Sequence, residues 1–211
     1  MTASDGRQGQ GAGTPVPRSA SSVPAAGLPD YAELRCVSTF SFLVGASQPE
    51  ELVERAHKQG YRALALTDEC SIAGVVRAHV AAKKIGLKLL IGSQFSVAVP
   101  EPSGSDAPGP FSLGVLACNL NGYGNLCEFI TKLRRASEKG TYHLNLGDIA
   151  SDELADCVVV ASPVRGSTDA QLVGLARWLL THFTGRCWLG VELLRQLDDE
   201  MWLHKLREAS D

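Results

Sequence analysis

Hydrophobic positions divide the chain into two unequal parts. Residues 1–28 consist largely of Gly, Ser, Ala, Pro and Gln, with almost no large apolar side chain. A segment of this composition cannot offset its ordering entropy by burial, so we expect a disordered leader. From Tyr31 onward, short apolar runs alternate with stretches of helical periodicity, which is typical of β-α units and a mostly parallel sheet. We therefore expect a folded α/β domain over residues 29–211.

Short apolar runs predict the strands of this sheet. They cover residues 32–37, 63–66, 88–91 with a continuation towards 97–99, 112–117, 157–161 and 188–193. Residues 101–110 are rich in Pro, Gly and Ser and are expected to form a loop between the third and fourth strands. Successive β-α steps at this density are typical of α/β barrels and doubly wound sheets.

Helices are expected between the strands, because apolar residues recur there at helical spacing. The first begins with the capping-box spacing of Ser47 and Glu50, and the second covers residues 72–85 and is closed by Gly86. A later helix follows a cap at Thr168. The apolar residues that carry the spacing are Leu52, Val53 and Ala56 in the first helix, Leu126, Phe129, Ile130 and Leu133 in the third, Leu172, Leu175, Ala176 and Leu179 in the fourth, and Met201, Trp202 and Leu206 in the last, at residues 198–208.

Composition narrows the class of protein. The 211 residues are 45% hydrophobic and 20% charged, which is enough for one sizeable core and favours one domain or a large part of one. The net charge of -3 gives no general attraction to nucleic acid or to an anionic membrane, so any DNA contact must be local or belong to another domain. The chain lacks an apolar run long enough to span a bilayer and a signal-peptide pattern, which predicts a cytoplasmic protein.

The cysteine pattern agrees with this compartment. There is no C-x-x-C pair and no tight cluster, so neither a zinc ribbon nor a disulfide framework is predicted. We interpret the six residues as reduced thiols, at Cys36, Cys70, Cys118, Cys127, Cys157 and Cys187.

Five residues at the predicted strand ends form the candidate site. In a β/α barrel, side chains at the carboxyl ends of successive strands converge on one mouth. Arg35, Val37, Asp68, Glu69 and Gln94 should therefore be neighbours. Arg35 and Val37 are two residues apart on a strand and share a face, which is the spacing that a His-x-His metal pair would use.

Several ordered blocks from Tyr31 onward resemble one known family. The blocks are Tyr31-Ala32-Glu33-Leu34, Phe40-Ser41-Phe42-Leu43, Gly45-Ala46-Ser47, Pro49-Glu50-Glu51-Leu52, Ala65-Leu66-Thr67-Asp68-Glu69-Cys70-Ser71, Gly74-Val75-Val76-Arg77-Ala78-His79, Ile91-Gly92-Ser93 and Gly122-Tyr123-Gly124-Asn125-Leu126. They resemble the PHP (polymerase and histidinol phosphatase) domain at the N-terminus of bacterial C-family DNA polymerases, most closely its error-prone branch. This resemblance implies a partial PHP-type barrel, distorted and TIM-like, with roughly the first five or six strands and an incomplete C-terminal end.

The resemblance also implies a degenerate metal site. Active PHP domains carry His-x-His after the first strand, Asp-His after the second and Glu after the third, and these hold up to three metal ions for phosphoester hydrolysis. The same places in this chain hold Arg35 and Val37, then Asp68 and Glu69, then Gln94. Only Asp68 keeps the ligand type, Val37 cannot bind a metal, and Arg35 brings a positive charge that would repel one. We therefore assign no catalytic, cofactor-binding or metal-binding residue to this segment.

Arg35 suggests how the site could persist without metal. Its guanidinium could neutralise Asp68 and Glu69 in place of a cation. The alternative is that Arg35 simply reaches solvent at the rim of the barrel, where ion pairs contribute little.

Other candidate residues carry less chemistry. The histidines have no ligand spacing among them and are expected to be structural or at the surface: His57, His79, His143, His182 and His204. A basic stretch is interpreted as a solvated helical face, with contact to DNA phosphate as the alternative, and comprises Lys132, Arg134, Arg135 and Lys139. Residues 121–124 lack the pattern of a phosphate loop and are predicted to form a turn. Cys36 and Cys70 are interpreted as inert thiols.

Three functions remain in competition. The leading hypothesis is a structural PHP segment of an error-prone polymerase that acts in damage-induced translesion synthesis, with the polymerase body, in the same or a companion chain, as its partner. DNA would be contacted only through the full-length protein, Mg²⁺ would belong to the polymerase domain, and no membrane partner is expected. The alternatives are a stand-alone metal-dependent phosphoesterase of the PHP type and a truncated gene product without independent activity. A barrel without its last strands would expose two sheet edges and an apolar interior, so we expect marginal stability in isolation.

Overall fold

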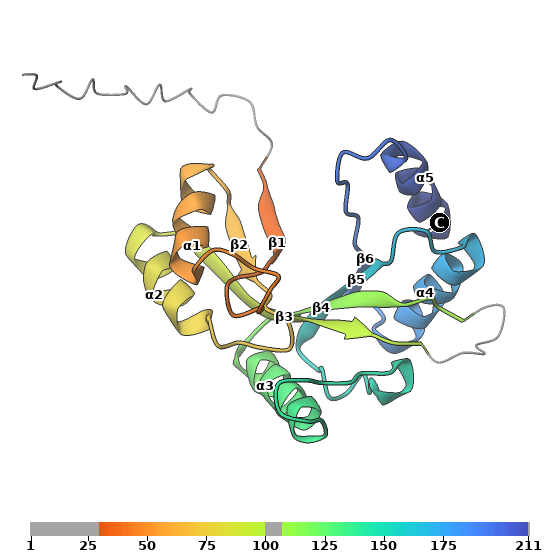
Figure 1. Ribbon diagram of the computed structural model, residues 1–211, viewed down its shortest axis with the longest axis horizontal. Coiled ribbons are helices and arrows are strands. Elements are labelled where there is room, and N and C mark those ends of the chain that lie inside the picture. Colours follow the sequence, from red (N-terminus) through yellow and green to blue (C-terminus); the bar gives the residue numbers. More distant parts are fainter. Residues whose placement is uncertain (1–29, 100–106, 211) are drawn as a thin grey trace, which may run out of the picture.

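The computed structural model describes residues 30–99 and 107–210, and it contains a six-stranded sheet whose strands lie side by side in chain order (Figure 1). The predicted leader at residues 1–28 and residues 101–106 of the predicted loop lie outside the described residues. The strands are β1 (Ala32–Cys36), β2 (Ala63–Leu66), β3 (Lys88–Val97), β4 (Phe111–Ala117), β5 (Cys157–Pro163) and β6 (Cys187–Leu189). The helices are α1 (Pro49–Lys58), α2 (Val75–Ile85), α3 (Leu120–Arg135), α4 (Asp169–His182) and α5 (Asp199–Ser210), with a short 3-10 helix at Leu146–Asp148.

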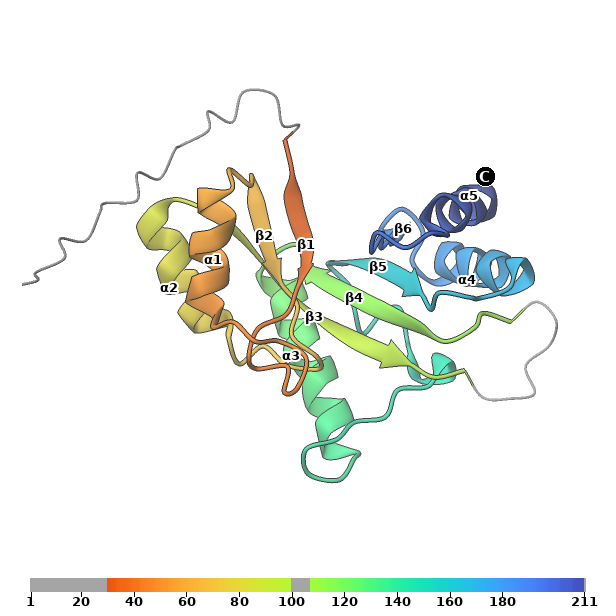
Figure 2. The same ribbon diagram turned by 45° about the horizontal axis from the view of Figure 1, so that its top comes forward.

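The helices cover one side of a curved sheet. Figures 1 and 2 show α1 and α2 beside β1 to β3, α3 beneath the middle of the sheet, and α4 and α5 beside β5 and β6. The other face of the sheet is concave, and the two outermost strands, β1 and β6, form its borders. The prediction of a partial barrel with five or six strands is therefore confirmed.

The expectation of a mostly parallel sheet requires correction at its centre. β1 with β2, β2 with β3 and β5 with β6 are parallel, whereas β3 with β4 and β4 with β5 are antiparallel. Parallel neighbours need a crossover connection, usually a helix, and β3 is followed by a Pro- and Gly-rich segment in place of one. The chain therefore returns beside β3 in the opposite direction.

β3 changes partners at Gly92. Residues 88–91 pair with β2, and residues 92–97 pair with β4. A Cβ atom at Gly92 would lie 2.5 Å from the backbone oxygen of Val115 on β4, so a larger residue could not occupy this position without a shift. Glycine thus allows one long strand to serve both halves of the sheet.

Helix ends agree with the predicted signals to within a few residues. The capping residue of α1 is Gln48 and not Ser47, and the backbone N–H of Gln48 donates to Glu51 at 2.8 Å. The start of α2 at Val75 is later than predicted, but its end at Gly86, in the left-handed conformation with φ 77°, is confirmed. At α4 the backbone N–H of Thr168 donates to the side chain of Gln171 at 2.9 Å, which confirms the predicted cap.

The last predicted strand is too long. β6 ends at Leu189, because its pairing with β5 ends at Ala161, and the N–H of Gly190 donates to the carbonyl of Ala161 at 2.7 Å. In α5, Trp202 and Leu206 are buried as the pattern requires, whereas Met201 is exposed. Residues 191–194 line the open side of the sheet instead of extending it.

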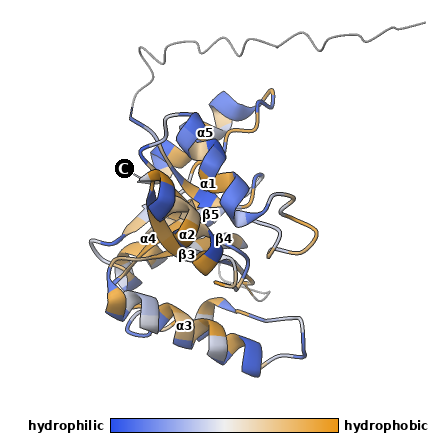
Figure 3. Cartoon of the chain, turned by 90° about the vertical axis from the view of Figure 1, so that its left-hand side faces the viewer, coloured by the Kyte–Doolittle hydropathy of each residue, from blue (hydrophilic) through white to orange (hydrophobic). Residues whose placement is uncertain are grey.

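Buried and less buried side chains alternate along the central strands, so one face of the sheet packs on the helices and the other is the concave face. On β4, Phe111, Leu113 and Val115 are buried and belong to the main core, which also contains residues of α3 and α4. Figure 3 shows apolar and polar segments along α3, consistent with its amphipathic spacing. A second core lies between α1, α2 and β2, and it contains Val53, Ala56, Leu64, Leu66, Val75, Ala78, Ala82 and Leu87.

The two outermost strands of the sheet predict self-association of the chain. Among the described strands, β1 and β6 each pair on one side only, and Leu34 is 45% exposed on β1. Leu34→Lys should reduce association, because a charge on an edge strand opposes further pairing, and it should cost little stability at so exposed a position. Sedimentation velocity measures the effect, with Leu120→Lys, an exposed leucine on α3, as the control. A monomeric unmodified chain would contradict the prediction.

Candidate functional site

The ends of β2 and β3 hold three of the predicted site residues together. The N–H of Gln94 donates to the carbonyl of Asp68 at 3.2 Å, and the N–H of Cys70 donates to the carbonyl of Gln94 at 2.9 Å. Glu69 and Gln94 form a parallel bridge beyond the regular strand. Cys70 has a positive φ of 45°, an uncommon conformation for a residue with a side chain, and it turns the chain sharply after Glu69. Asp68, Glu69 and Gln94 are therefore neighbours, as their positions in the sequence predict.

The carboxylate of Asp68 is buried, and both of its oxygens accept hydrogen bonds. Its side chain accepts from the backbone N–H of Ser38 and from the hydroxyls of Ser38 and Ser41, each at 2.7 Å. The serines lie on the loop after β1. This loop can close tightly because residue 45 is glycine, since a Cβ atom at Gly45 would lie 2.0 Å from the carbonyl oxygen of Ser38. Charge-assisted bonds from three donors compensate the burial of this carboxylate.

Glu69 is satisfied by a second set of donors. Its side chain accepts from the Gln94 amide at 2.9 Å, from the N–H and hydroxyl of Ser96 at 3.1 and 3.0 Å, and from the hydroxyl of Tyr142. Burial raises the pKa of Tyr142, and its hydrogen bond to Glu69 raises that pKa further. Tyr142 therefore stays protonated and acts as a donor to Glu69.

Arg35 has other partners than the sequence suggests. Its Nε donates to Gln94 at 2.8 Å, one terminal nitrogen donates to Ser112 at 3.3 Å, and another forms an ion pair with Glu192. The hypothesis that Arg35 neutralises Asp68 and Glu69 by direct contact is wrong, because the loop serines bond to Asp68, and Arg35 is connected to Glu69 only through Gln94. The alternative of a rim position is confirmed in part: Arg35 is exposed, but these bonds join β1 to the segment after β6. Burial lowers the pKa of Arg35, and the charge of Glu69 opposes this effect at longer range.

Val37 belongs to an apolar groove on the concave face. The groove has a volume of about 980 Å³ and is also lined by Arg35 and Gln94. Its walls are mostly aliphatic and aromatic, including Leu90, Leu116, Val158, Val160 and Trp188. The mouth of the partial barrel thus offers a mostly apolar surface whose charged residues are Arg35, Glu33 and Glu192.

A metal ion does not fit the donor set of this site. In the part of the chain that the structure describes, no group of three or more His, Cys, Asp or Glu side chains could hold a metal ion. The oxygens of Asp68 and Glu69 already accept hydrogen bonds, and Arg35 and Val37 supply no lone pair for coordination. The two carboxylates serve as acceptors in a protein network.

Sequence reasoning missed the residues that complete this network. Ser38 and Ser41 follow a strand end, a position that could have suggested them, but Tyr142 and Glu192 carry no such signal. Arg134 was assigned to a solvated basic face, yet its side chain donates to the carbonyls of Cys70 and Glu69, each at 3.2 Å. It also lies over the ring of Tyr142, with the guanidinium carbon 5.5 Å from the ring centroid. Arg134, on α3, therefore binds the backbone of the turn that carries Glu69.

The remaining candidates lie away from the strand ends. Lys132 pairs with Glu153 at 2.6 Å, whereas Arg135 and Lys139 are exposed. All five histidines are exposed and scattered over the surface, as predicted. Burial raises the pKa of Cys36 and of Cys70 to about 11, which favours the interpretation of inert thiols.

Residues 121–124 form helix and not the predicted turn. They lie in the first turns of α3, where the side chain of Asn119 accepts from the N–H of Gly122 at 3.0 Å. Gly122 permits close contact with the segment just before β5, since a Cβ atom there would lie 2.1 Å from the carbonyl oxygen of Asp156. The glycines in this segment therefore serve packing at a helix start.

Comparison with known proteins identifies the family. The sequence pattern of the PHP domain matches residues 33–170, which is more than half of the chain. This chain belongs to the PHP domain family. Within the described residues, no helix of this PHP domain is long and apolar enough to cross a membrane.

Its relatives are polymerases of much greater length. The chain is 50% identical over 182 residues to an error-prone DNA polymerase of Bordetella parapertussis, a match that covers 82% of this chain and 17% of the relative. It is 50% identical over 170 residues to an error-prone DNA polymerase of Dechloromonas aromatica, with 79% and 15% covered. The chain therefore spans about one sixth of the length of these relatives.

Two solved structures share the fold at low identity. A putative metal-dependent phosphoesterase from Bifidobacterium adolescentis superposes with a TM-score of 0.58 at 17% identity, covering 85% of this chain and 84% of that one. An amidohydrolase from Chromobacterium violaceum gives a TM-score of 0.59 at 18% identity, covering 84% and 83%. These likenesses support the partial barrel and say nothing further about chemistry.

The network predicts which residue stabilises the buried carboxylate. Ser38→Ala should lower the free energy of unfolding by about 2 kcal/mol, because it removes a bond to a buried charge. Arg35→Ala should lower it by less than about 1 kcal/mol, because its ion pair with Glu192 is partly exposed. Urea denaturation of the two variants measures the difference. A larger loss for Arg35→Ala than for Ser38→Ala would restore the guanidinium as the main partner of the carboxylates.

Proposed function

We propose that this PHP domain is a structural module of an error-prone DNA polymerase. The observation that carries the proposal is the match at 50% identity to two such polymerases, over most of this chain. Primer extension with deoxynucleoside triphosphates would be performed by the rest of the polymerase, in the same or a companion chain. Mg²⁺ would be bound there, and this segment would need no cofactor of its own.

We further propose that the site at the strand ends is a degenerate PHP metal site with a structural role. Asp68 and Glu69 hold the ends of β1, β2 and β3 together through serine, glutamine and tyrosine donors. Such a network fixes three chain segments without an ion. Arg35 adds a fourth connection, to the segment after β6.

The cellular role follows from the same relatives. The polymerase is proposed to act in the cytoplasm on damaged templates, during translesion synthesis, and to meet DNA through domains other than this one. The net charge of -3 supports the last point, because it gives this domain no general attraction to phosphate. A stand-alone phosphoesterase is disfavoured, since the fold likeness to such a protein is not matched by a suitable donor set among the residues that the structure describes.

A metal titration tests the degenerate site. Adding Mn²⁺ or Zn²⁺ should leave the Tm of the chain unchanged, because an ion that does not bind the native state cannot stabilise it. Differential scanning calorimetry with and without a chelator measures this. Stoichiometric binding that Glu69→Gln abolishes, in a variant that remains folded by circular dichroism, would contradict the proposal.

A chimera tests the polymerase assignment. In the Bordetella parapertussis polymerase, the matching segment is replaced with residues 30–210 of this chain, and primer extension is measured. Activity should be retained, because the two segments share half of their residues and the catalytic machinery is proposed to lie elsewhere. The polymerase without either segment is the control and should lose activity through misfolding. A folded, soluble chimera without primer extension would count against the assignment.

A further inference from the structure

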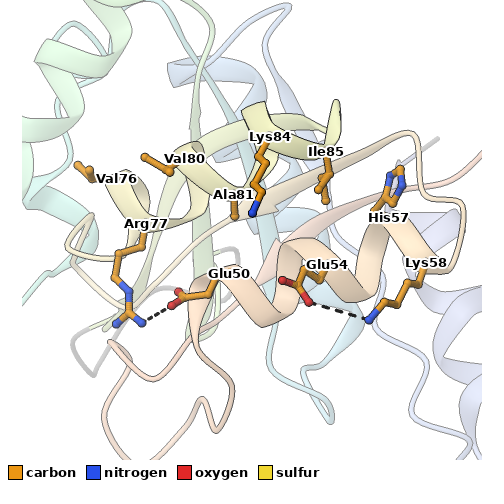
Figure 4. Close-up of a pocket in the computed structure, with 10 residues that line it drawn as sticks. All are labelled: Glu50, Glu54, His57, Lys58, Val76, Arg77, Val80, Ala81, Lys84 and Ile85. Atoms are coloured by element: carbon orange, nitrogen blue, oxygen red, sulfur yellow. Dashed lines mark hydrogen bonds and ion pairs between the residues drawn. The ribbon is translucent and has the colours of Figure 1, made fainter.

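A groove runs between α1 and α2 on the outer side of the sheet. Its volume is about 620 Å³, and Figure 4 shows the side chains that line it. Residues of α1 form one wall at positions 50, 54, 57 and 58, and residues of α2 form the floor and the other wall at positions 76, 77, 80, 81, 84 and 85. Both sets follow helical spacing, so the groove extends along the length of each helix.

The floor of the groove is apolar although α2 already buries another face. Val75, Ala78 and Ala82 pack into the core, whereas Val76 and Val80 are 71% and 63% exposed on the outside. β-Branched residues lower helix propensity, and here they gain no burial in return. A helix with apolar residues on two faces is expected to pack on both sides.

Charge is distributed unevenly along the groove. At the end where both helices begin, Glu50 pairs with Arg77, and its second carboxylate oxygen is shielded from solvent without a hydrogen-bond partner among the described residues. At the other end, Lys84 has no ion pair in the described structure, and Lys58 makes only a long contact of 3.9 Å with Glu54. The first end is therefore closed by an internal ion pair, whereas the second end presents two lysines to an anionic group.

We propose that this groove binds one amphipathic helix of a partner protein, in an orientation antiparallel to α1 and α2. The partner helix would lay apolar residues spaced four apart over Val76 and Val80. Acidic residues in its first turn would meet Lys58 and Lys84, and its last turn would lie beside the ion pair of Glu50 and Arg77. The helix would be about eleven residues long, to match α2.

Helix electrostatics favours the same orientation. Acidic side chains are favourable in the first turn of a helix and basic ones in its last turn. The charges that the groove selects are thus the ones that stabilise the incoming helix itself. Antiparallel packing also opposes its dipole to those of α1 and α2. The proposal goes beyond the polymerase assignment and does not depend on it.

A synthetic peptide tests the proposal on the whole chain. The peptide is about twelve residues long, with glutamates in the first turn, leucines along one face and lysines in the last turn. Its Kd is measured by isothermal titration calorimetry for the unmodified chain and for Val80→Gln, Lys84→Glu and Leu180→Gln. Leu180 lies on α4 and is 63% exposed, like Val80, so Leu180→Gln is the matched control. Circular dichroism shows whether each variant is folded.

Val80→Gln and Lys84→Glu should each weaken binding about tenfold, with Leu180→Gln unchanged. A spin label on the N-terminus of the peptide should broaden the amide signals near Lys84 more than those near Glu50. Absence of binding, or binding that Val80→Gln leaves unaltered, would overturn the groove as a helix site. Broadening centred on Glu50 would overturn the antiparallel orientation.

Discussion

Burial of the Asp68 carboxylate is the constraint on which the candidate site depends. The side chain is 1% exposed, so its charge must be compensated by donors within the protein. Ser38 and Ser41 provide them at 2.7 Å, and in doing so they fix the loop after β1 against the end of β2. Glu69 repeats the arrangement with Gln94 and thereby includes the end of β3. Two neighbouring carboxylates thus hold together the loop after β1 and the ends of β2 and β3.

The sheet places these connections together through a change of partner within a single strand. β3 pairs with β2 up to residue 91 and with β4 from residue 92. Gln94 therefore lies on the part of β3 that faces β4, yet it reaches back to the carbonyl of Asp68. The same change of partner places Ser112 of β4 within reach of Arg35 on β1. The concave face of the partial barrel is thus linked across strands that are not adjacent.

The sequence predicted features that depend on local pattern. Six strands in order, the caps at Thr168 and Gly86, and the proximity of Asp68, Glu69 and Gln94 all follow from short motifs. The antiparallel centre was not predicted, because an apolar run marks the position of a strand and not its direction. Distant partners such as Glu192 were also not predicted, because the pairing of charges across a barrel mouth has no signal in a single sequence. The predicted solvent-exposed position of Arg134 was wrong, because the sequence of a basic helical stretch is the same whether all of its side chains face solvent or one of them packs against the protein.

The bond between Arg35 and Glu192 has a consequence for the order of folding. Its two residues lie near opposite ends of the described chain, so their contact closes a very long loop. Entropy makes such a contact slow to form compared with those between consecutive elements. The bond therefore belongs to the end of the folding reaction, after the sheet has curved. We expect an interaction of this kind to act mainly on the rate of unfolding, and only to a small extent because the pair is partly exposed.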